Sequence, residues 1–148
     1  MIHVCAAVIY LNGKYLLTSR PPGKHLEGLW EFPGGKVHMN ESVHNGLIRE
    51  LREELDVDIV PLEKIYSIKH EYPEKKEFLE FFRAVPVDII SFNPVPHEGQ
   101  GIRWVKPNNL CDVDWMPADR PLAEYLARHL SPNIGNTLNC NDSSLHEK

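Results

Sequence analysis

The chain has 148 residues, enough for one domain with a hydrophobic core and too few for two. Its composition is typical of a soluble globular protein, and its formal net charge of −5 argues against a general nucleic-acid or membrane-surface binder. No segment is long and apolar enough to span a membrane, and no basic leader precedes the first apolar run. With three widely spaced cysteines, interpreted as reduced thiols, these features predict a cytoplasmic protein.

Two strands joined by a tight turn are predicted at the start of the chain. The near-continuous apolar run of residues 3–10 is typical of a buried strand. An Asn-Gly pair, a strong hairpin signal, follows it, so residues 14–19 are predicted to be the returning strand. Residues 21–29 are rich in proline and glycine and predict a loop of the kind that often carries binding residues. Residues 30–33 predict a short strand that enters a pair of glycines.

A helix with adjoining apolar and acidic faces is predicted after the glycine pair and a short loop. Asn40 is its predicted N-cap. The apolar stripe consists of Val43, Leu47, Leu51 and Leu55. The acidic residues Glu50, Glu53 and Glu54 lie within an arc of roughly 100° beside that stripe. The carboxylates are therefore expected to line a cleft at the edge of the protein.

Three like charges at this spacing repel one another, so something is expected to compensate them. One candidate is a hard divalent cation, because Mg²⁺ takes carboxylate oxygens together with substrate phosphates. The other is a set of salt bridges with Arg49 and Arg52 on a solvated helix, which is the more frequent explanation for a helix rich in arginine and glutamate. The helix alone leaves both interpretations open.

The second half of the chain predicts a hairpin, a loop and a final helix. Residues 62–72 and 77–87 predict two antiparallel strands around a polar turn, and residues 102–105 predict another short strand. Between them, residues 92–101 predict a loop that carries Glu98, which in isolation would simply be solvated. Residues 107–117 predict a loop with a possible helical turn.

The final helix is predicted over residues 119–130, with Asp119 at its start and a proline in its first turn. The residues predicted to share one side of it are Leu122, Tyr125, Leu126, His129 and Leu130. Residues 131–148 are polar and rich in turn-forming residues, and predict a mobile tail after a domain of residues 1–130.

The segment from Gly35 to Val57 resembles the signature of the Nudix hydrolase family. That signature reads Gly, five residues, Glu, seven residues, then Arg-Glu-aliphatic-any-Glu-Glu-any-Gly-aliphatic. The chain matches at Gly35, Glu41, Arg49, Glu50, Leu51, Glu53, Glu54 and Val57. Asp56 stands where the signature has glycine, which would suit the left-handed turn that ends a helix. Asp tolerates that conformation at some cost, so the departure is expected to lower stability slightly without removing a ligand.

The runs LLTSRPPGKHLEGLWEFPGGK, HEGQGIRWV and MPADRPLAEYL are similar to the MutT-type branch of that family. The resemblance implies an α/β fold, an α/β/α sandwich around a mixed sheet. It also implies a divalent metal, normally Mg²⁺ with Mn²⁺ as an alternative, and hydrolysis of nucleoside triphosphates to the monophosphate and pyrophosphate. The partner is then a small nucleotide, with no nucleic acid or membrane, and the protein is a monomer or a weak homodimer.

The resemblance implies three groups of functional residues, assigned by their positions in the family's motifs. The residues that match the metal cluster are the Gly34 carbonyl, Glu50, Glu53, Glu54 and Glu98. The catalytic residues are Glu50, Glu53, Glu98 and Arg49, where the arginine orients the glutamates and either Glu50 or Glu98 takes a proton from water. The residues that match nucleotide contacts are Arg20, His25, Phe32, Tyr72 and Asp119. For a lone Phe32, burial in the core is the default alternative.

Asp119 bears on base preference. It stands where the 8-oxoguanine-selective MutT enzyme has Asn, whose amide both donates and accepts, whereas an ionised Asp only accepts. An acceptor suits the exocyclic amine of cytosine or adenine, or the N1–H and N2–H₂ edge of guanine. Alternatively, Asp119 merely caps its helix.

Four functions follow from the resemblance. The first is a Mg²⁺-dependent pyrophosphohydrolase that removes oxidised nucleotides, 8-oxo-dGTP foremost. The second acts on CTP, dCTP or 5-methyl-dCTP. The third is a non-catalytic module that senses a nucleotide or ADP-ribose, and the fourth a diadenosine-polyphosphate or ADP-ribose hydrolase. The intact glutamates argue against the third, and the MutT-like flanks against the fourth.

Overall fold

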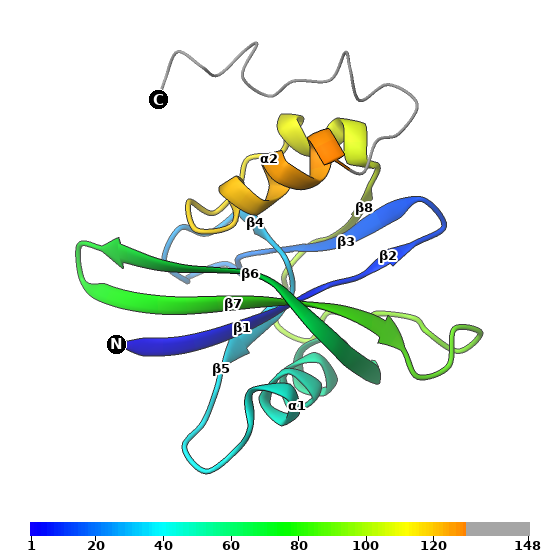
Figure 1. The fold of residues 1–148 in the computed structure, drawn as a ribbon, viewed down its shortest axis with the longest axis horizontal. Helices are drawn as coiled ribbons and strands as arrows, with labels where there is room; N and C mark the ends of the chain where they lie inside the picture. The colour runs from blue at the N-terminus through cyan, green and yellow to red at the C-terminus, as the bar shows by residue number, and fades with distance from the viewer. Residues whose placement is uncertain (130–148) are drawn as a thin grey trace.

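Two four-stranded sheets lie between two helices in the computed structural model, which describes residues 1–129 (Figure 1). The helix α1 (Val43–Leu55) packs below the sheets and α2 (Arg120–His129) above them in the view of Figure 1. The expected arrangement of helices on both sides of a mixed sheet is therefore confirmed. Only one sheet was predicted, whereas the structure has a second, antiparallel sheet beside the mixed one.

The mixed sheet has the order β5-β1-β7-β6. Its central strand β1 (Ile2–Val8) pairs antiparallel with β5 (Gly34–Lys36) and parallel with β7 (Lys75–Pro86). The strand β6 (Ile59–Tyr72) pairs antiparallel with β7 around a polar turn, which confirms the predicted hairpin. The sequence did not predict β5, since glycines disfavour strands.

The second sheet is built on β3 (Lys14–Ser19). Its neighbours are β2 (Tyr10–Leu11) and β8 (Ile102–Val105), and β4 (Trp30–Glu31) at its carboxyl end, all antiparallel. The predicted pairing of the first long strand with the returning strand is only partly right. The run of residues 3–10 divides at Ile9, so that β1 joins the mixed sheet while β2 alone forms the hairpin with β3.

The near-continuous apolar sequence of β1 is explained by burial of both of its faces. Ala6 and Val8 belong to a cluster that packs under α2, whereas Cys5, Ala7 and Ile9 belong to a cluster that packs on α1. The strand β7 divides in the same way, with Phe81 towards α2 and Phe82 towards α1. The helices therefore fix the sheets from both sides.

The helix α1 begins after Ser42, whose Oγ accepts a hydrogen bond from the Asn45 N–H at 3.0 Å. The prediction of Asn40 as N-cap was wrong: Asn40 has a left-handed backbone (φ 69°) two residues before the cap, whereas Ser42 has the extended backbone of a capping residue. At the other end Asp56 is left-handed (φ 59°, ψ 40°), and its N–H caps the carbonyls of the last turn. Asp56, which replaces the glycine of the family signature, therefore has the left-handed backbone that favours glycine.

The chain between β8 and α2 contains a short 3₁₀ helix, η1 (Pro107–Asp112), as predicted. On α2 the buried residues are Leu122, Ala123, Leu126 and Ala127. Of the residues predicted to share one side of this helix, Leu122 and Leu126 are buried, whereas Tyr125 and His129 are exposed and stack on each other, with ring centroids 4.1 Å apart. Ala123 and Ala127 complete the buried face instead. Leu130 and the predicted tail of residues 131–148 lie outside the described residues.

None of the helices within residues 1–129 is long and apolar enough to cross a membrane. Cys5 is a free, fully buried thiol, as expected. The interpretation of all three cysteines as reduced was wrong for Cys111, which is disulfide-bonded.

Candidate active site

A cavity of about 580 Å³ opens between the glycine pair, the end of α1, the loop after β3 and the start of α2. The predicted site residues that line it are Arg20, His25, Phe32, Gly34, Glu50, Glu54, Tyr72, Glu98 and Asp119. These residues are far apart in the sequence, and they come from two strands of the mixed sheet (β5 and β6), from α1, and from the segments that follow β3 and β4 and precede β8 and α2. The structure thus gathers most of the residues that the resemblance assigns to metal and nucleotide. The other two, Arg49 and Glu53, lie on α1 beside the cavity and do not line it.

The glycine pair is required by close packing against the acidic helix. A Cβ on Gly35 would overlap the Glu50 carboxylate, and a Cβ on Gly34 would overlap the Cys5 carbonyl of the neighbouring strand β1. Glu50 is only 7 % exposed, so its carboxylate is held between β5 and the cavity. The two glycines therefore allow α1 to approach the sheet closely enough to present Glu50 there.

Arg49 forms hydrogen bonds with three carboxylates near the glycine pair. Its guanidinium donates two hydrogen bonds to Glu41, at 3.1 and 2.8 Å, and one each to Glu50 and Glu53 at 3.1 Å. It also donates to the Lys36 carbonyl at 2.9 Å. The hydrogen bond to Arg49 lowers the pKa of Glu41 to about 2, with help from the His38 N–H. Glu53 remains largely exposed, with 58 % of its side chain accessible.

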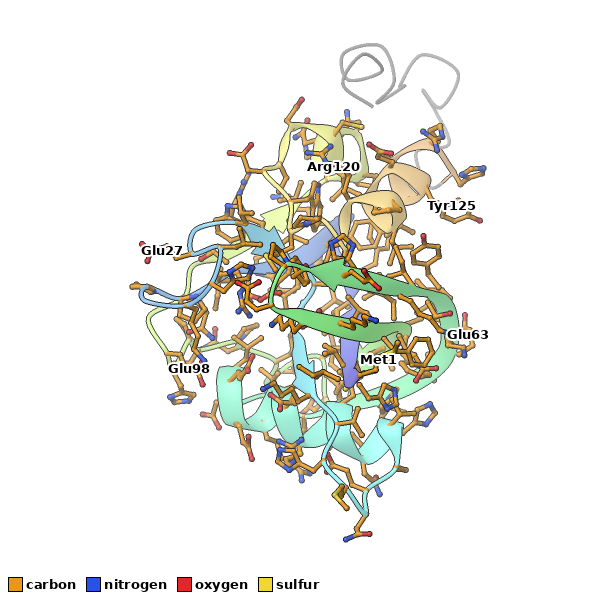
Figure 2. The ribbon with its side chains drawn as sticks, turned by 90° about the vertical axis from the view of Figure 1, so that its left-hand side faces the viewer. Met1, Glu27, Glu63, Glu98, Arg120 and Tyr125 are labelled. Carbon is orange, nitrogen blue, oxygen red and sulfur yellow. The ribbon has the colours of Figure 1, made fainter. Side chains whose placement is uncertain are left out.

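The other edge of α1 carries the carboxylates that face the cavity. Burial, and then the charges of Glu50 and Glu98, raise the pKa of Glu54 to about 9. Glu98 comes from the loop before β8, which is fastened to the end of α1: Val95 N–H donates to the Leu55 carbonyl at 2.8 Å and His97 N–H to the Glu54 carbonyl at 3.1 Å. Figure 2 shows Glu98 beside the end of α1, on the opposite side of the molecule from Glu63. A loop glutamate is therefore held next to helix glutamates.

These oxygen donors fit a hard divalent cation. Three carboxylates and the Gly34 carbonyl border one cavity, and the raised pKa of Glu54 reports negative charge that the protein itself does not compensate. Within residues 1–129 no three acidic, histidine or cysteine side chains already converge as a ready-made metal site. Arg49 instead holds oxygens of Glu50 and Glu53. The donor chemistry fits a hard divalent cation, which these carboxylates would hold only after side-chain movement.

At the other end of the cavity Asp119 binds the edge of β4. Backbone bonds from Trp30 N–H to the Asp114 carbonyl and from Met116 N–H to the Trp30 carbonyl, both 2.8 Å, set the chain before α2 along that strand. The next N–H on this edge, that of Phe32, donates to Asp119 Oδ2 at 3.0 Å. Asp119 is 3 % exposed, and burial raises its pKa well above the ordinary value. Within residues 1–129 the Asp119 carboxyl thus bonds to the backbone just after β4, whereas its backbone carbonyl accepts from the Ala123 N–H of α2.

The aromatic residues at this end differ in environment. The Phe32 ring is 2 % exposed and stacks on Trp115 with centroids 5.0 Å apart, so it belongs to the core. Tyr72 is 8 % exposed, and its buried hydroxyl lies against the Ala118 backbone. His25 meets the Tyr72 ring edge-on, with centroids 5.5 Å apart. The Phe32 ring therefore packs as a core residue, whereas Tyr72 and His25 lie together at the wall of the cavity.

Arg20 lies at the Asp119 end of the cavity. Its Nε donates to the His25 carbonyl at 3.1 Å, and its Nη1 lies 3.8 Å from Glu31 Oε2. Three lysines, Lys24, Lys36 and Lys75, also line the cavity. An acidic protein therefore presents a local group of cations where an anionic substrate would lie.

Sequence reasoning missed several polar residues of the cavity, among them the three lysines, Glu31 and Gln100. Glu31 was taken only as part of a short strand, although it lines the cavity and burial raises its pKa to about 7. Gln100 is 7 % exposed; its side chain accepts from the Glu98 N–H at 2.8 Å and donates to the Glu54 carbonyl at 3.3 Å. The one available signal was their position inside the runs WEFPGG and HEGQ, next to residues already singled out.

Comparison with known proteins adds a family, two relatives and a solved structure. The model of the NUDIX domain family matches residues 4–125. The CTP pyrophosphohydrolase of Escherichia coli K12 is 38 % identical over 124 residues, 84 % of this chain and 90 % of that protein. The 8-oxo-dGTP diphosphatase of Proteus vulgaris is 35 % identical over 82 residues, 55 % of this chain and 73 % of that protein. The solution structure of the E. coli ORF135 protein superposes with a TM-score of 0.73 at 36 % identity, covering 90 % of this chain and 94 % of that one.

Proposed function

The chain belongs to the NUDIX domain family, and on that premise we propose that it is a Mg²⁺-dependent nucleoside-triphosphate pyrophosphohydrolase. Its main substrate is 8-oxo-dGTP, and its role is to remove oxidised nucleotides from the pool before they are incorporated into DNA. Residues 1–130 form the hydrolase domain, which acts in the cytoplasm on free nucleotides as a monomer or a weak homodimer. Water and the nucleoside triphosphate react to give the monophosphate and pyrophosphate.

One observation carries this proposal: a single cavity joins a carboxylate edge, a group of cations and a buried base-reading end. The charges that act on Glu54 come chiefly from Glu50 and Glu98, whereas those that act on Asp119 come chiefly from Glu31. The cavity therefore has two acidic ends with Arg20 close to one of them. A metal-bound triphosphate beside Glu54 and a base beside Asp119 would explain why each end of the cavity is acidic.

The residues that would hold the metal are Glu50, Glu53, Glu54, Glu98 and the Gly34 carbonyl. When bound, Mg²⁺ supplies neutralisation of charge on the phosphate oxygens and a more acidic water. Arg49 keeps Glu50 and Glu53 in position through the hydrogen bonds described above. Either Glu50 or Glu98 accepts the proton of the attacking water. The lysines and Arg20 contact the phosphates.

The variant Glu53→Gln distinguishes a pyrophosphohydrolase from a non-catalytic module that senses a nucleotide. Glu53 is mostly exposed and does not support the core, so the variant is expected to fold. We expect turnover to fall at least about 100-fold while the nucleotide still binds, because the carboxylate acts on the reaction and not on the base. Equal, negligible turnover by wild type and variant, with intact binding, would favour the sensing module.

A second substrate class, the cytosine nucleotides CTP, dCTP and 5-methyl-dCTP, is favoured by the 38 % identity with the E. coli CTP pyrophosphohydrolase. The two classes are separated by kcat/KM for pyrophosphate release over 8-oxo-dGTP, dGTP and the three cytosine nucleotides. The proposal predicts the highest value for 8-oxo-dGTP. A higher value for any cytosine nucleotide would assign the enzyme to the second class. ADP-ribose and diadenosine tetraphosphate, which we expect not to be cleaved, complete the panel.

A further inference from the structure

The strand β6 leaves one edge of the mixed sheet open. It is the outermost strand in the order β5-β1-β7-β6, and β7 is its only strand partner within residues 1–129 (Figure 1). It is 14 residues long, whereas a usual strand has about five or six. The open edge of a strand presents a row of unpaired backbone N–H and C=O groups, so natural proteins either cover such an edge or protect it.

The two halves of this edge are protected differently. In the first half Pro61 has no N–H to donate, and the register with β7 shifts between Pro61 and Lys64 and again between Lys64 and Tyr66. Prolines and bulges of this kind prevent a further strand from pairing. From Tyr66 to Tyr72 the register with β7 is continuous, and this half contains no proline. Residues 66–72 therefore form a regular edge on which another strand can pair.

Two opposite charges lie on one face of this regular half. Lys69 and Glu71 are two positions apart, so their side chains point to the same face of the sheet, and both are exposed. Glu71 forms an ion pair with Lys76 at 3.5 Å, in which the side chains are 71 % and 63 % exposed. An ion pair as open to water as this one contributes little. Lys69 and Glu71 are therefore accessible to a second molecule.

A second copy of this chain fits the edge in one register. When two identical strands pair antiparallel about a two-fold axis, opposite residues lie on the same face, so the axis passes through one residue position. An axis at Lys69 or at Glu71 sets like charges against each other, and an axis at Ile68 sets the lysine against a serine. Axes earlier in the strand bring its bulged half into the ladder. An axis at His70 sets Lys69 of each copy opposite Glu71 of the other.

We propose that the chain forms a two-fold dimer through the β6 edge, in which residues 68–72 of two copies pair antiparallel around His70. The occupant is a second copy because the edge carries both of the charges that it has to face, so that it is complementary to itself. A lysine alone on an open edge hinders pairing. With Glu71 two positions later, Lys69 instead favours one partner in one register. The mixed sheets of the two copies then join into one continuous sheet.

This dimer is expected to be weak. A ladder over residues 68–72 with two ion pairs is smaller than a standard interface, which buries about 800 Å² on each partner. We therefore expect a dissociation constant between about 10 μM and 1 mM. Salt screens both the ion pairs and the repulsion between two chains of net charge −5, so all samples are compared at one ionic strength.

Charge reversal tests the register, with sedimentation equilibrium over a range of protein concentrations as the measurement. Lys69→Glu places glutamates opposite each other in a homodimer, and Glu71→Lys places lysines opposite each other. Each variant alone should raise the dissociation constant at least about tenfold. An equimolar mixture of the two variants restores both opposite-charge pairs, and so does the double variant. Both should associate within about threefold of the wild type.

The matched control is Lys76→Gln, which removes the intramolecular partner of Glu71 but no contact of the dimer. It should associate like the wild type. Net charge alone predicts a different pattern, because Glu71→Lys makes the chain less negative and would then strengthen association. A stronger dimer of Glu71→Lys would therefore contradict the proposed pairing.

A wild type that keeps the monomer mass of 17.0 kDa up to about 1 mM would overturn the dimer. Wild-type association that neither the mixture nor the double variant recovers would overturn the register around His70. Neither result bears on the proposed reaction, since the carboxylates assigned to the metal lie on α1 and in the loop before β8. The charge-reversed variants should release pyrophosphate like the wild type, whereas failure of the proposed function would abolish release in all of them.

Discussion

Arg49 bonds to more acidic partners than the sequence alone could indicate. The spacing of the acidic helix left open whether arginine or a metal compensates the glutamates. The structure shows the arginine joining Glu41, Glu50 and Glu53, while Glu54 and Glu98 have no arginine partner within residues 1–129. The salt-bridge interpretation therefore holds for Glu50 and Glu53, and the metal remains a prediction for Glu54.

The Arg49→Lys variant tests this role. A lysine keeps the charge but cannot reproduce the planar fork that contacts three glutamates and the Lys36 carbonyl. We expect kcat to fall about 10- to 100-fold with KM nearly unchanged, since the glutamates lose their alignment while the base contacts stay. Arg52→Lys, on the exposed side of the same helix, is the control and should stay within about twofold. Equal losses in both variants would contradict the positioning role.

The left-handed Asp56 predicts a graded series of stabilities. Gly has no Cβ penalty in this conformation, Asp tolerates it, and Ala and Val do not. The free energy of unfolding should follow the order Gly, Asp, Ala, Val, with Asp56→Gly more stable than wild type by about 0.5–1 kcal/mol. Urea denaturation measures the series, and activity should be unchanged for Asp56→Gly. A destabilised Asp56→Gly would mean that the Asp side chain makes a compensating interaction.

At the scale of elements, the loop of residues 95–100 carries the least predictable part of the site. Its sequence indicates only a proline- and glycine-rich connection, yet three hydrogen bonds to the Leu55 and Glu54 carbonyls fix it on the end of α1. A helix end leaves carbonyls without intrahelical partners, and this loop uses them. Gln100 bridges the loop to the helix and thereby holds Glu98 beside Glu54.

Replacing Gln100 by Leu should release this loop. Leu has a similar volume but neither accepts from the Glu98 N–H nor donates to the Glu54 carbonyl. We expect kcat to fall about tenfold and the loop amides to exchange faster with solvent, while the sheets keep their protection. His97→Ala, in the same exposed loop, is the control, because His97 uses its backbone N–H. Unchanged exchange in Gln100→Leu would show that backbone bonds suffice.

Local patterns predicted most elements but not their partners. Residues 14–19 and 102–105 were predicted as strands with the observed limits, and the acidic helix was located by its apolar stripe and glutamate spacing. The parallel pairing of β1 with β7 joins residues more than seventy positions apart, and no local pattern encodes it. The same limit explains why Glu31 was missed: it lines one cavity with Asp119, a neighbour only in space. The short β5 was missed because glycine pairs usually indicate loops.

At the scale of the whole molecule, an acidic protein keeps an acidic cluster at its site, and this should appear in its stability. The folded state raises the pKa of Glu54 from 4.5 to about 9, mainly by burial and by the charges of Glu50 and Glu98. Between these two values the folded state binds more protons than the unfolded state. The free energy of unfolding therefore falls as pH rises through this window, and the loss is complete above about pH 9.

Glu54→Gln should remove part of this pH dependence. At pH 8 without metal, we expect the variant to melt at least about 3 °C above the wild type, and the difference to shrink at pH 5. Mg²⁺ should raise the melting temperature of the wild type at pH 8 and raise that of the variant less. Glu71→Gln, whose side chain is 71 % exposed, is the control. A variant that melts below the wild type at pH 8 would contradict the proposed uncompensated charge.

The central claim is that the cavity cleaves a nucleoside triphosphate to the monophosphate and pyrophosphate with the help of a divalent metal. The most direct measurement is quantification of both products from 8-oxo-dGTP, with Mg²⁺ and with excess chelator, in wild type and Glu54→Gln. We predict equal amounts of 8-oxo-dGMP and pyrophosphate from the wild type with Mg²⁺, and at least about a 100-fold loss with chelator or in the variant. Release of orthophosphate would contradict this claim. Turnover that neither chelator nor Glu54→Gln reduces would contradict it as well.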